Sequence, residues 1–450
     1  MSKQSILAKD LREMITGFRK IVPRQSETLR DVKVDFAQGT ITATDGSAFL
    51  SYQLGKATPD GRTYLLSFDS LIHFAKGLPA RQKILIEAQD GIANLTTENR
   101  KCVAKPLRPD DPFATPPKFV GKTQPVTPED RSAILRALTC ASTDDTRYIL
   151  RGVFLEHEGT TPQVVGTDGR CLYHEPLRSM EIPKPFILPA SPLLSWKGFE
   201  HEWQLKVSRS KKEPTMLQLT AGPWTFTTPA IDGNYPNWRQ VVPEARTRPT
   251  RLTLGKDDIA TLREMKGESI GFLSKPDEVR FVTFDKEANK WNTHQAKDST
   301  CQGNCQVFID PKFLKRALDT EVHEACMAEE LDPILFRGKG QLIVMPLRVT
   351  GPPIPDKDPK PKQKEPPKPV APPQPKPMQS NTPNQNKSTP SELALESLKT
   401  LKTQLRESIG LVDQAMRNLR DAQANQRATQ KDIKTIRGTL QSLKKVAFPN

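Results

Sequence analysis

Three side chains with the chemistry of a nucleophilic site lie within seven consecutive positions: Asp168, Cys171 and His174. A thiol beside a base and an orienting carboxylate is the arrangement of a cysteine nucleophile. If one strand continues past the turn at Asp168, however, side-chain alternation places Cys171 and His174 on opposite faces of the sheet. The neighbouring residues offer no recognisable oxyanion site. A cysteine enzyme therefore stands as an alternative that the variant Cys171→Ser would test.

A second group, Cys301, Cys305, His323 and Cys326, contains side chains that zinc accepts as ligands. Their spacing differs from the C-x2-C pairs typical of zinc sites. The chain also has no phosphate-binding loop of the form G-x-x-x-x-G-K-[ST]. We therefore expect a protein that is not an enzyme and that holds no metal and no cofactor.

The charge balance indicates a different kind of partner. The chain has 67 Lys and Arg against 52 Asp and Glu, a net charge of +15, which favours binding to a polyanion such as nucleic acid. No stretch reaches the roughly 18 uncharged apolar residues of a membrane span, and the first residues do not form a signal-peptide pattern. Six cysteines in 450 residues are too few to staple a fold. These features predict a soluble, cytoplasmic protein with no membrane partner.

The last hundred residues differ from the rest. Between residues 351 and 390 there are 14 prolines among Lys, Gln and Asn, a composition that cannot form a core and predicts a flexible linker. From 391 to 447, apolar residues recur at spacings of three and four, which predicts a coiled-coil helix whose partner is unknown. The alternatives are one long helix that docks on the body and a hairpin that folds back near Asn425. The tail carries a net charge of +9 and could also touch DNA.

The first 350 residues contain weak internal repeats. Alternating apolar residues around a turn at Gln38 and Gly39 predict a hairpin that ends in the sequence Thr-Asp-Gly at residues 44–46. The same pattern leads into Thr-Asp-Gly at 167–169, and a fainter copy leads into Asp285. The copies are about 120 residues apart.

A second sequence pattern repeats at the same spacing and predicts an apolar strand followed by a short helix. It begins at Ser67, Leu188 and Phe308, and we expect Asp69, Ser191 and Asp310 to cap the three helices. Each copy is preceded by an amphipathic helix, predicted at 7–21, 128–139 and 256–265. The fold class is therefore α+β, with predicted domains at 1–120, 121–246 and 247–350. These numbered spans are called the first, second and third predicted domains below.

Three passages of this body resemble the bacterial sliding clamp family, the β subunit of DNA polymerase III. Residues 147–153 (RYILRGV), followed by 165–170 (VGTDGR), are similar to the family's middle-domain signature. Residues 232–243 (DGNYPNWRQVVP) match the pattern G-x-[FY]-P-[DN]-[YW]-x-x-[VL]-[VIL]-P, and residues 344–349 (VMPLRV) look like the family's terminus. The family normally stops there, whereas this chain continues for another hundred residues.

The resemblance implies three repeated DNA-clamp domains of the processivity fold in each chain. Two chains would pair head to tail as a homodimer, closing a ring whose helices surround double-stranded DNA. Such a ring needs only a diffuse positive lining that contacts phosphates. The candidates for DNA contacts are Arg24, Lys76, Lys197, Lys312 and Arg316.

The family also binds short peptides of DNA polymerases, the clamp loader and repair proteins in an apolar pocket between its second and third domains. The matching positions here are Leu150, Thr167, Gly169, Arg170, Leu172, Pro236, Val241, Met345, Pro346 and Leu347. Cys171 stands where the family often has a basic residue, and Gln240 where it often has Arg, so the peptide preference is expected to differ.

The resemblance thus predicts a DNA sliding clamp, a processivity factor that tethers a polymerase to duplex DNA. A clamp-derived scaffold or regulator of replication that does not encircle DNA is the alternative.

Overall fold

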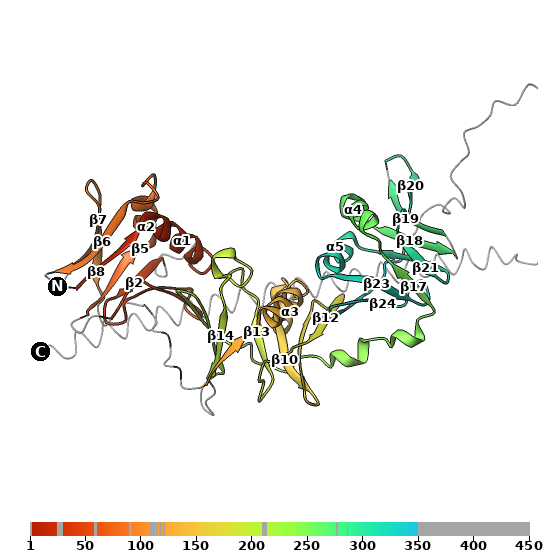
Figure 1. Cartoon of the computed structure of the whole chain (residues 1–450), viewed down its shortest axis with the longest axis horizontal. Helices are drawn as coiled ribbons and strands as arrows, with labels where there is room; N and C mark the ends of the chain where they lie inside the picture. The colour runs from red at the N-terminus through yellow and green to blue at the C-terminus, as the bar shows by residue number, and fades with distance from the viewer. Residues whose placement is uncertain are drawn as a thin grey trace, which may run out of the picture. The chain divides into compact units, whose positions relative to one another are not determined.

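The computed structural model describes residues 2–24, 30–57, 61–89, 92–107, 113, 116, 119, 122–208, 214–275, 278–285 and 287–349. The predicted linker and coiled coil lie outside these residues. The described part is α+β, as predicted (Figure 1). None of its helices is long and apolar enough to cross a membrane.

The elements of the first predicted domain alternate strands with two helices. They are β1 (Ser2–Leu7), α1 (Ala8–Phe18), β2 (Asp31–Asp35), β3 (Thr40–Thr44), β4 (Phe49–Gln53), β5 (Thr63–Ser67), α2 (Phe68–Ala75), β6 (Lys83–Gln89), β7 (Ile92–Thr96) and β8 (Lys101–Pro106). The two helices lie side by side, and α2 packs against β5 and β8 (Figure 1). The predicted hairpin is confirmed, since Val34 pairs with Ile41 across β2 and β3.

The second predicted domain follows the same plan. Its elements are β9 (Thr123–Val126), α3 (Pro128–Leu138), η1 (Asp145–Leu150), β10 (Gly152–Glu158), β11 (Thr161–Thr167), β12 (Cys171–Pro176), β13 (Phe186–Pro189), η2 (Lys197–Phe199), β14 (Trp203–Ser208), β15 (Met216–Ala221), β16 (Trp224–Pro229), η3 (Trp238–Val241) and η4 (Ala245–Thr247). The Thr127 hydroxyl caps α3 by accepting from the backbone N of Asp130, and α3 packs on β10, β11 and β12.

The third predicted domain repeats the helix pair. Its elements are β17 (Thr250–Thr253), α4 (Lys256–Glu264), β18 (Ile270–Lys275), β19 (Glu278–Asp285), β20 (Lys290–Gln295), β21 (Thr300–Gln302), β22 (Cys305–Ile309), α5 (Pro311–Asp319), β23 (Val322–Met327), β24 (Ile334–Gly338) and β25 (Gln341–Val344). As predicted, Asp310 caps α5, accepting at 2.8 Å from the backbone N of Lys312.

Among the caps predicted for the repeated short helices, Asp69 is wrong, and the helix expected after Ser191 does not form. Ser67, not Asp69, caps α2, because the Ser67 hydroxyl accepts from the backbone N of Ser70 while Asp69 turns outward to Arg30. The Ser191 hydroxyl accepts at 3.3 Å from the backbone N of Leu193, but no α-helix follows it. The backbone N of Leu194 and Trp196 bond to carbonyls three residues back, so residues 192–195 form tight turns.

A buried aspartate holds the loop over the opening helix in both the second and the third predicted domain. Asp130, the third residue of α3, accepts at 2.6 Å from the backbone N of Arg178. Asp258, the third residue of α4, accepts at 2.8 Å from the backbone N of Ser299. This shared contact is a repeat that the sequence patterns did not reveal.

Two sheets run from one predicted domain into the next. The order β1-β6-β7-β8-β5-β2-β3-β4-β16-β15-β14-β9 joins the first to the second, and β13-β10-β11-β12-β25-β24-β23-β17-β21 joins the second to the third. The joining pairs are β4 with β16 and β12 with β25, both antiparallel. The candidate site lies at the second of these junctions.

Candidate functional site

The segment from Thr167 to Leu172 is shaped by a turn that uses its own side chains. The Thr167 hydroxyl donates to the Cys171 carbonyl at 2.6 Å, and Asp168 Oδ1 accepts at 3.0 Å from the backbone N of Cys171. Gly169 has φ of +84°, which favours glycine. Because these bonds lie within five residues, the Thr-Asp-Gly sequence itself specifies the turn.

This turn forms one wall of a cavity of about 200 Å³ at the junction between β12 and β25. The other walls come from η1, from η3 and the loop that leads into it, and from the end of β25. The lining residues are Leu150, Thr167, Gly169, Arg170, Cys171, Leu172, Pro236, Asn237, Trp238, Val241, Ile343 and Met345. At its rim, Val241 and Met345 are 55% and 47% exposed. The cavity thus offers open apolar surface, beside which lies the exposed cation Arg170.

Trp238 is the largest lining side chain, and several contacts fix its ring. Its Nε1 donates to Glu156 at 2.7 Å, and the Arg239 guanidinium lies 4.5 Å from the ring centre. The His174 ring lies on it at 4.7 Å. Trp238 also belongs to a buried cluster with Leu172 and Ile343, so one wall of the cavity is rigidly packed.

Eight of the ten residues predicted for the pocket line this cavity. Pro346 and Leu347 are not among its lining residues. The backbone N of Leu347 donates to the Phe308 carbonyl at 2.8 Å, and its side chain packs with Leu273 and Val282. The chain therefore leaves the cavity after Met345.

Four lining residues were not among the predicted set: Cys171, Asn237, Trp238 and Ile343. A signal existed for each of them. Ile343 is two positions before Met345, as alternation along a strand requires. Asn237 and Trp238 fall inside the family-like motif at 232–243, and Cys171 directly follows the motif at 165–170.

The environment of Cys171 does not suit a nucleophile. Its hydrogen bond to Cys140, together with burial, raises the pKa of the Cys171 thiol, so the thiol stays protonated. As predicted by alternation, His174 lies on the other face of β12, against Trp238, and burial lowers its pKa. Within the described residues, no group of three His, Cys, Asp or Glu side chains is placed to hold a metal ion.

The predicted DNA-contacting residues fall into two sets. Arg24, Lys76, Lys197 and Lys312 are exposed. Arg316 points into the junction instead, where its Nη1 donates at 2.7 Å to Asp168 Oδ2 and the side chain is 15% exposed. The guanidinium of Arg316 is thus occupied by a carboxylate of its own chain.

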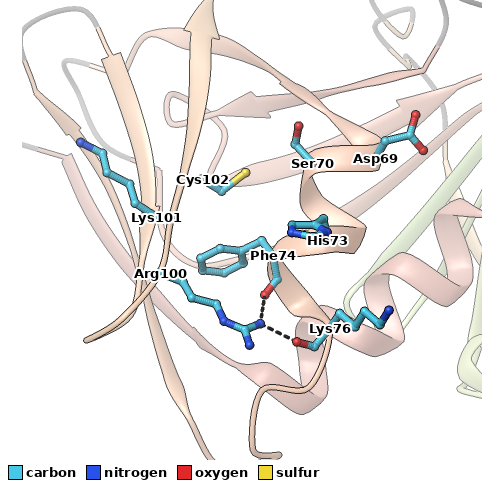
Figure 2. A pocket seen from close by; sticks show the side chains of 8 residues that line it. All are labelled: Asp69, Ser70, His73, Phe74, Lys76, Arg100, Lys101 and Cys102. Atoms are coloured by element: carbon cyan, nitrogen blue, oxygen red, sulfur yellow. Dashed lines mark hydrogen bonds between the residues drawn. The ribbon is translucent and has the colours of Figure 1, made fainter.

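A second cavity, of about 760 Å³, lies between α2 and β8 in the first predicted domain. Figure 2 shows Asp69, Ser70 and His73 on the helix, with Lys101 and Cys102 on the strand. Arg100 donates to the carbonyls of Phe74 and Lys76 and so holds the end of α2. Lys101 and Ala104 pair with β7, whereas β5 pairs with β8 only at Lys105 and Pro106. Lys101 and Cys102 of β8 face the cavity.

The fold is that of sliding clamps. The clamp structure from Pseudomonas aeruginosa bound to griselimycin superposes with a TM-score of 0.66 at 17% identity, covering 77% of this chain and 99% of that chain. The sliding clamp from Bacillus subtilis gives 0.65 at 18% identity, with coverage of 77% and 99%.

Sequence comparison leads to the same family. The β sliding clamp of Proteus mirabilis is 26% identical over 219 residues, 46% of this chain and 55% of that protein. That of Vibrio cholerae is 25% identical over 263 residues, 54% and 67% of the two chains. The Proteus alignment thus spans about half of that relative's length, and no family model matches. The resemblance to the bacterial β sliding clamps, DNA polymerase III subunit beta, is confirmed.

Proposed function

We propose that this protein is a DNA sliding clamp, a non-enzymatic processivity factor that encircles duplex DNA in the cytoplasm and tethers a replicative polymerase. The observation that carries the proposal is the cavity between β12 and β25. Residues from three family-like motifs, far apart in the sequence, meet there in a clamp fold. The proposed domain boundaries fall after residues 120 and 246.

Ring closure needs a surface that a second copy can cover, and the α2–β8 face supplies one. Part of the β8 edge is unpaired by β5, and Val103 on this strand is 50% exposed. Lys76 and Lys101 make the face basic. The four-stranded sheet of the third predicted domain ends in β20 and β22, whose outer edges can extend the partner's sheet. In a head-to-tail homodimer, the β8 edge of one chain would pair with the β20 or the β22 edge of the other chain.

Inside such a ring, a diffuse positive field suffices to hold DNA without reading its sequence. Arg24, Lys76, Lys197 and Lys312 are the candidates that the exposure of their side chains supports. Arg316 is left out because it is paired with Asp168. Lys76 also lies on the α2–β8 face that we propose a second copy covers. Among the four candidates, we therefore expect Lys76 to contribute least to DNA binding.

The cavity between β12 and β25 is proposed to take an apolar peptide segment of the polymerase or of the clamp loader. The apolar lining fits one or two Leu or Phe side chains, and Arg170 favours an acidic neighbour. The tail, as an added coiled coil on a flexible tether, would raise the local concentration of its own partner.

Topological retention on DNA tests the proposal. The full chain is assembled on nicked circular DNA by a clamp loader and then passed over a sizing column at high salt, before and after the DNA is linearised. A clamp stays on the circle and slides off the linear molecule. Equal loss from both forms, with peptide binding intact, would replace the clamp by the scaffold alternative.

A further inference from the structure

Arg316 connects the third predicted domain to the pocket wall in the second. It lies on α5, 148 positions from Asp168, and its Nη1 donates at 2.7 Å to Asp168 Oδ2. The same nitrogen lies 2.7 Å from Cys171 Sγ. The guanidinium also stacks near the ring of Phe313, at 5.3 Å, which fixes its direction.

The two oxygens of Asp168 have separate partners. Oδ1 accepts at 3.0 Å from the backbone N of Arg170 and at the same distance from that of Cys171. Oδ2 accepts from Arg316. One carboxylate therefore ties α5 to the backbone of two residues that line the pocket. A displacement of α5 would be passed directly to that wall.

This ion pair is shielded from water. The Arg316 and Asp168 side chains are only 15% and 13% exposed. Burial would raise the pKa of Asp168, but hydrogen bonds from Arg316 and the two backbone amides outweigh it and lower the pKa. A pair of this kind fixes geometry more than it adds stability, because desolvation offsets much of the attraction.

We propose that Arg316 is a positioning residue for the partner-peptide pocket: from α5 it holds the Asp168 turn so that Gly169, Arg170 and Cys171 form a preset wall. The inference rests on the proposed function of the cavity. It assigns to Arg316 a role in peptide affinity that direct contact with DNA would not produce.

The test uses full-length protein carrying Arg316→Met, with Lys315→Met as the matched control, since Lys315 is the exposed neighbour on the same helix. The probe is a short fluorescein-labelled peptide ending in Asp-Leu-Phe, whose binding is followed by anisotropy. We expect Arg316→Met to weaken peptide binding about tenfold and Lys315→Met to leave it within twofold. In the Asp168→Asn background, Arg316→Met should add little further loss, because the two residues act as one unit.

A second readout follows the wall without any peptide. Cys171 is 3% exposed, so iodoacetamide should label it slowly in the wild type and faster in Arg316→Met, as located by mass spectrometry. If Arg316→Met fails to fold, Arg316→Lys replaces it and should give an intermediate loss of affinity. Unchanged peptide affinity in a folded Arg316 variant overturns the inference, whatever the labelling rate. A wild type that does not bind the peptide overturns the proposed pocket function, and this inference with it.

Discussion

The two junctions between predicted domains have the same strand pairing but differ in the side chains that fill them. β4 pairs with β16 at the first junction and β12 with β25 at the second, and a Thr-Asp-Gly turn precedes β4 and β12 alike. Trp196 and Arg316 occupy equivalent places in the repeat, because they are separated by the same 120 positions as Leu188 and Phe308. Both residues contact the preceding domain: Lys20 Nζ lies 6.0 Å from the centre of the Trp196 ring, and Arg316 donates to Asp168.

At the first junction the packing around Trp196 is aromatic. The Trp196 ring lies 5.3 Å from that of Trp224, which also contacts Phe18 and Tyr52. A Cβ at Gly17 would come within 2.6 Å of Trp224, so glycine is needed for the rings to approach α1. At the second junction, Arg316 makes a polar contact and an open cavity lies beside it. At the same repeat position, Trp196 thus fills the first junction, whereas Arg316 leaves an open cavity at the second.

The largest expected effect is at the aromatic junction. Trp224→Ala removes a fully buried ring from among three aromatic neighbours and should lower the free energy of unfolding by about 3–5 kcal/mol. Chemical denaturation measures this change. Tyr148→Ala, at a 55% exposed ring, is the control and should change stability by less than about 0.5 kcal/mol. Comparable losses in the two variants would contradict the account of the first junction as a packed seal.

The second prediction concerns the cavity. Met345→Ser places a polar group on the apolar rim and should weaken binding of the Asp-Leu-Phe peptide about tenfold, with the melting temperature nearly unchanged because Met345 is 47% exposed. Anisotropy and thermal melting give the two values. Thr227→Ser, at the corresponding end of β16, should leave peptide binding as it is. A rim variant that binds as well as the wild type would separate the cavity from partner recognition.

The third prediction uses acid. The lowered pKa of Asp168 means that its pair with Arg316 stabilises the fold fully above about pH 4, the ordinary carboxyl pKa, and is lost as the pH falls through the lowered value. The difference in melting temperature between wild type and Asp168→Asn should therefore shrink from pH 7 to pH 3. Asp45→Asn, at a turn with the same backbone hydrogen bonds, is the matched control. A difference that stays constant on acidification would show that the charge of Asp168 is not what matters.

The smallest expected effect is on DNA. Replacing Lys197 or Lys312 by Gln should lower the salt slope of DNA binding by about one unit for each phosphate that is no longer neutralised. Binding measured between low and moderate salt gives the slope. Lys339→Gln, at a lysine that is already paired with Glu321, should leave it unchanged. Equal slopes in all variants would remove these lysines from the ring lining.

Most of the local structure could be read from the sequence. The opening helix of the second predicted domain was predicted at 128–139 and is found at Pro128–Leu138, because Thr127 and Pro128 define its start. The predictions of local structure failed at two helix starts. Ser67 displaced Asp69 as a cap, and residues 192–195 took tight turns where a helix was expected. At α2 two polar residues near the helix start could have served as the cap, and the ion pair of Asp69 with Arg30 left that role to Ser67.

The sequence by itself determined the repeats and the Thr-Asp-Gly turns, since each depends on bonds or alternation within a few residues, whereas the eight predicted residues of the cavity came from the resemblance to the sliding clamp family. Only the tertiary structure decided that Arg316 pairs with Asp168 rather than facing DNA, and that Leu347 leaves the cavity for Phe308. These contacts join segments far apart in the chain. The residues next to a charged or an apolar side chain do not indicate which distant residue it will contact. Their partners are set by how the domains meet.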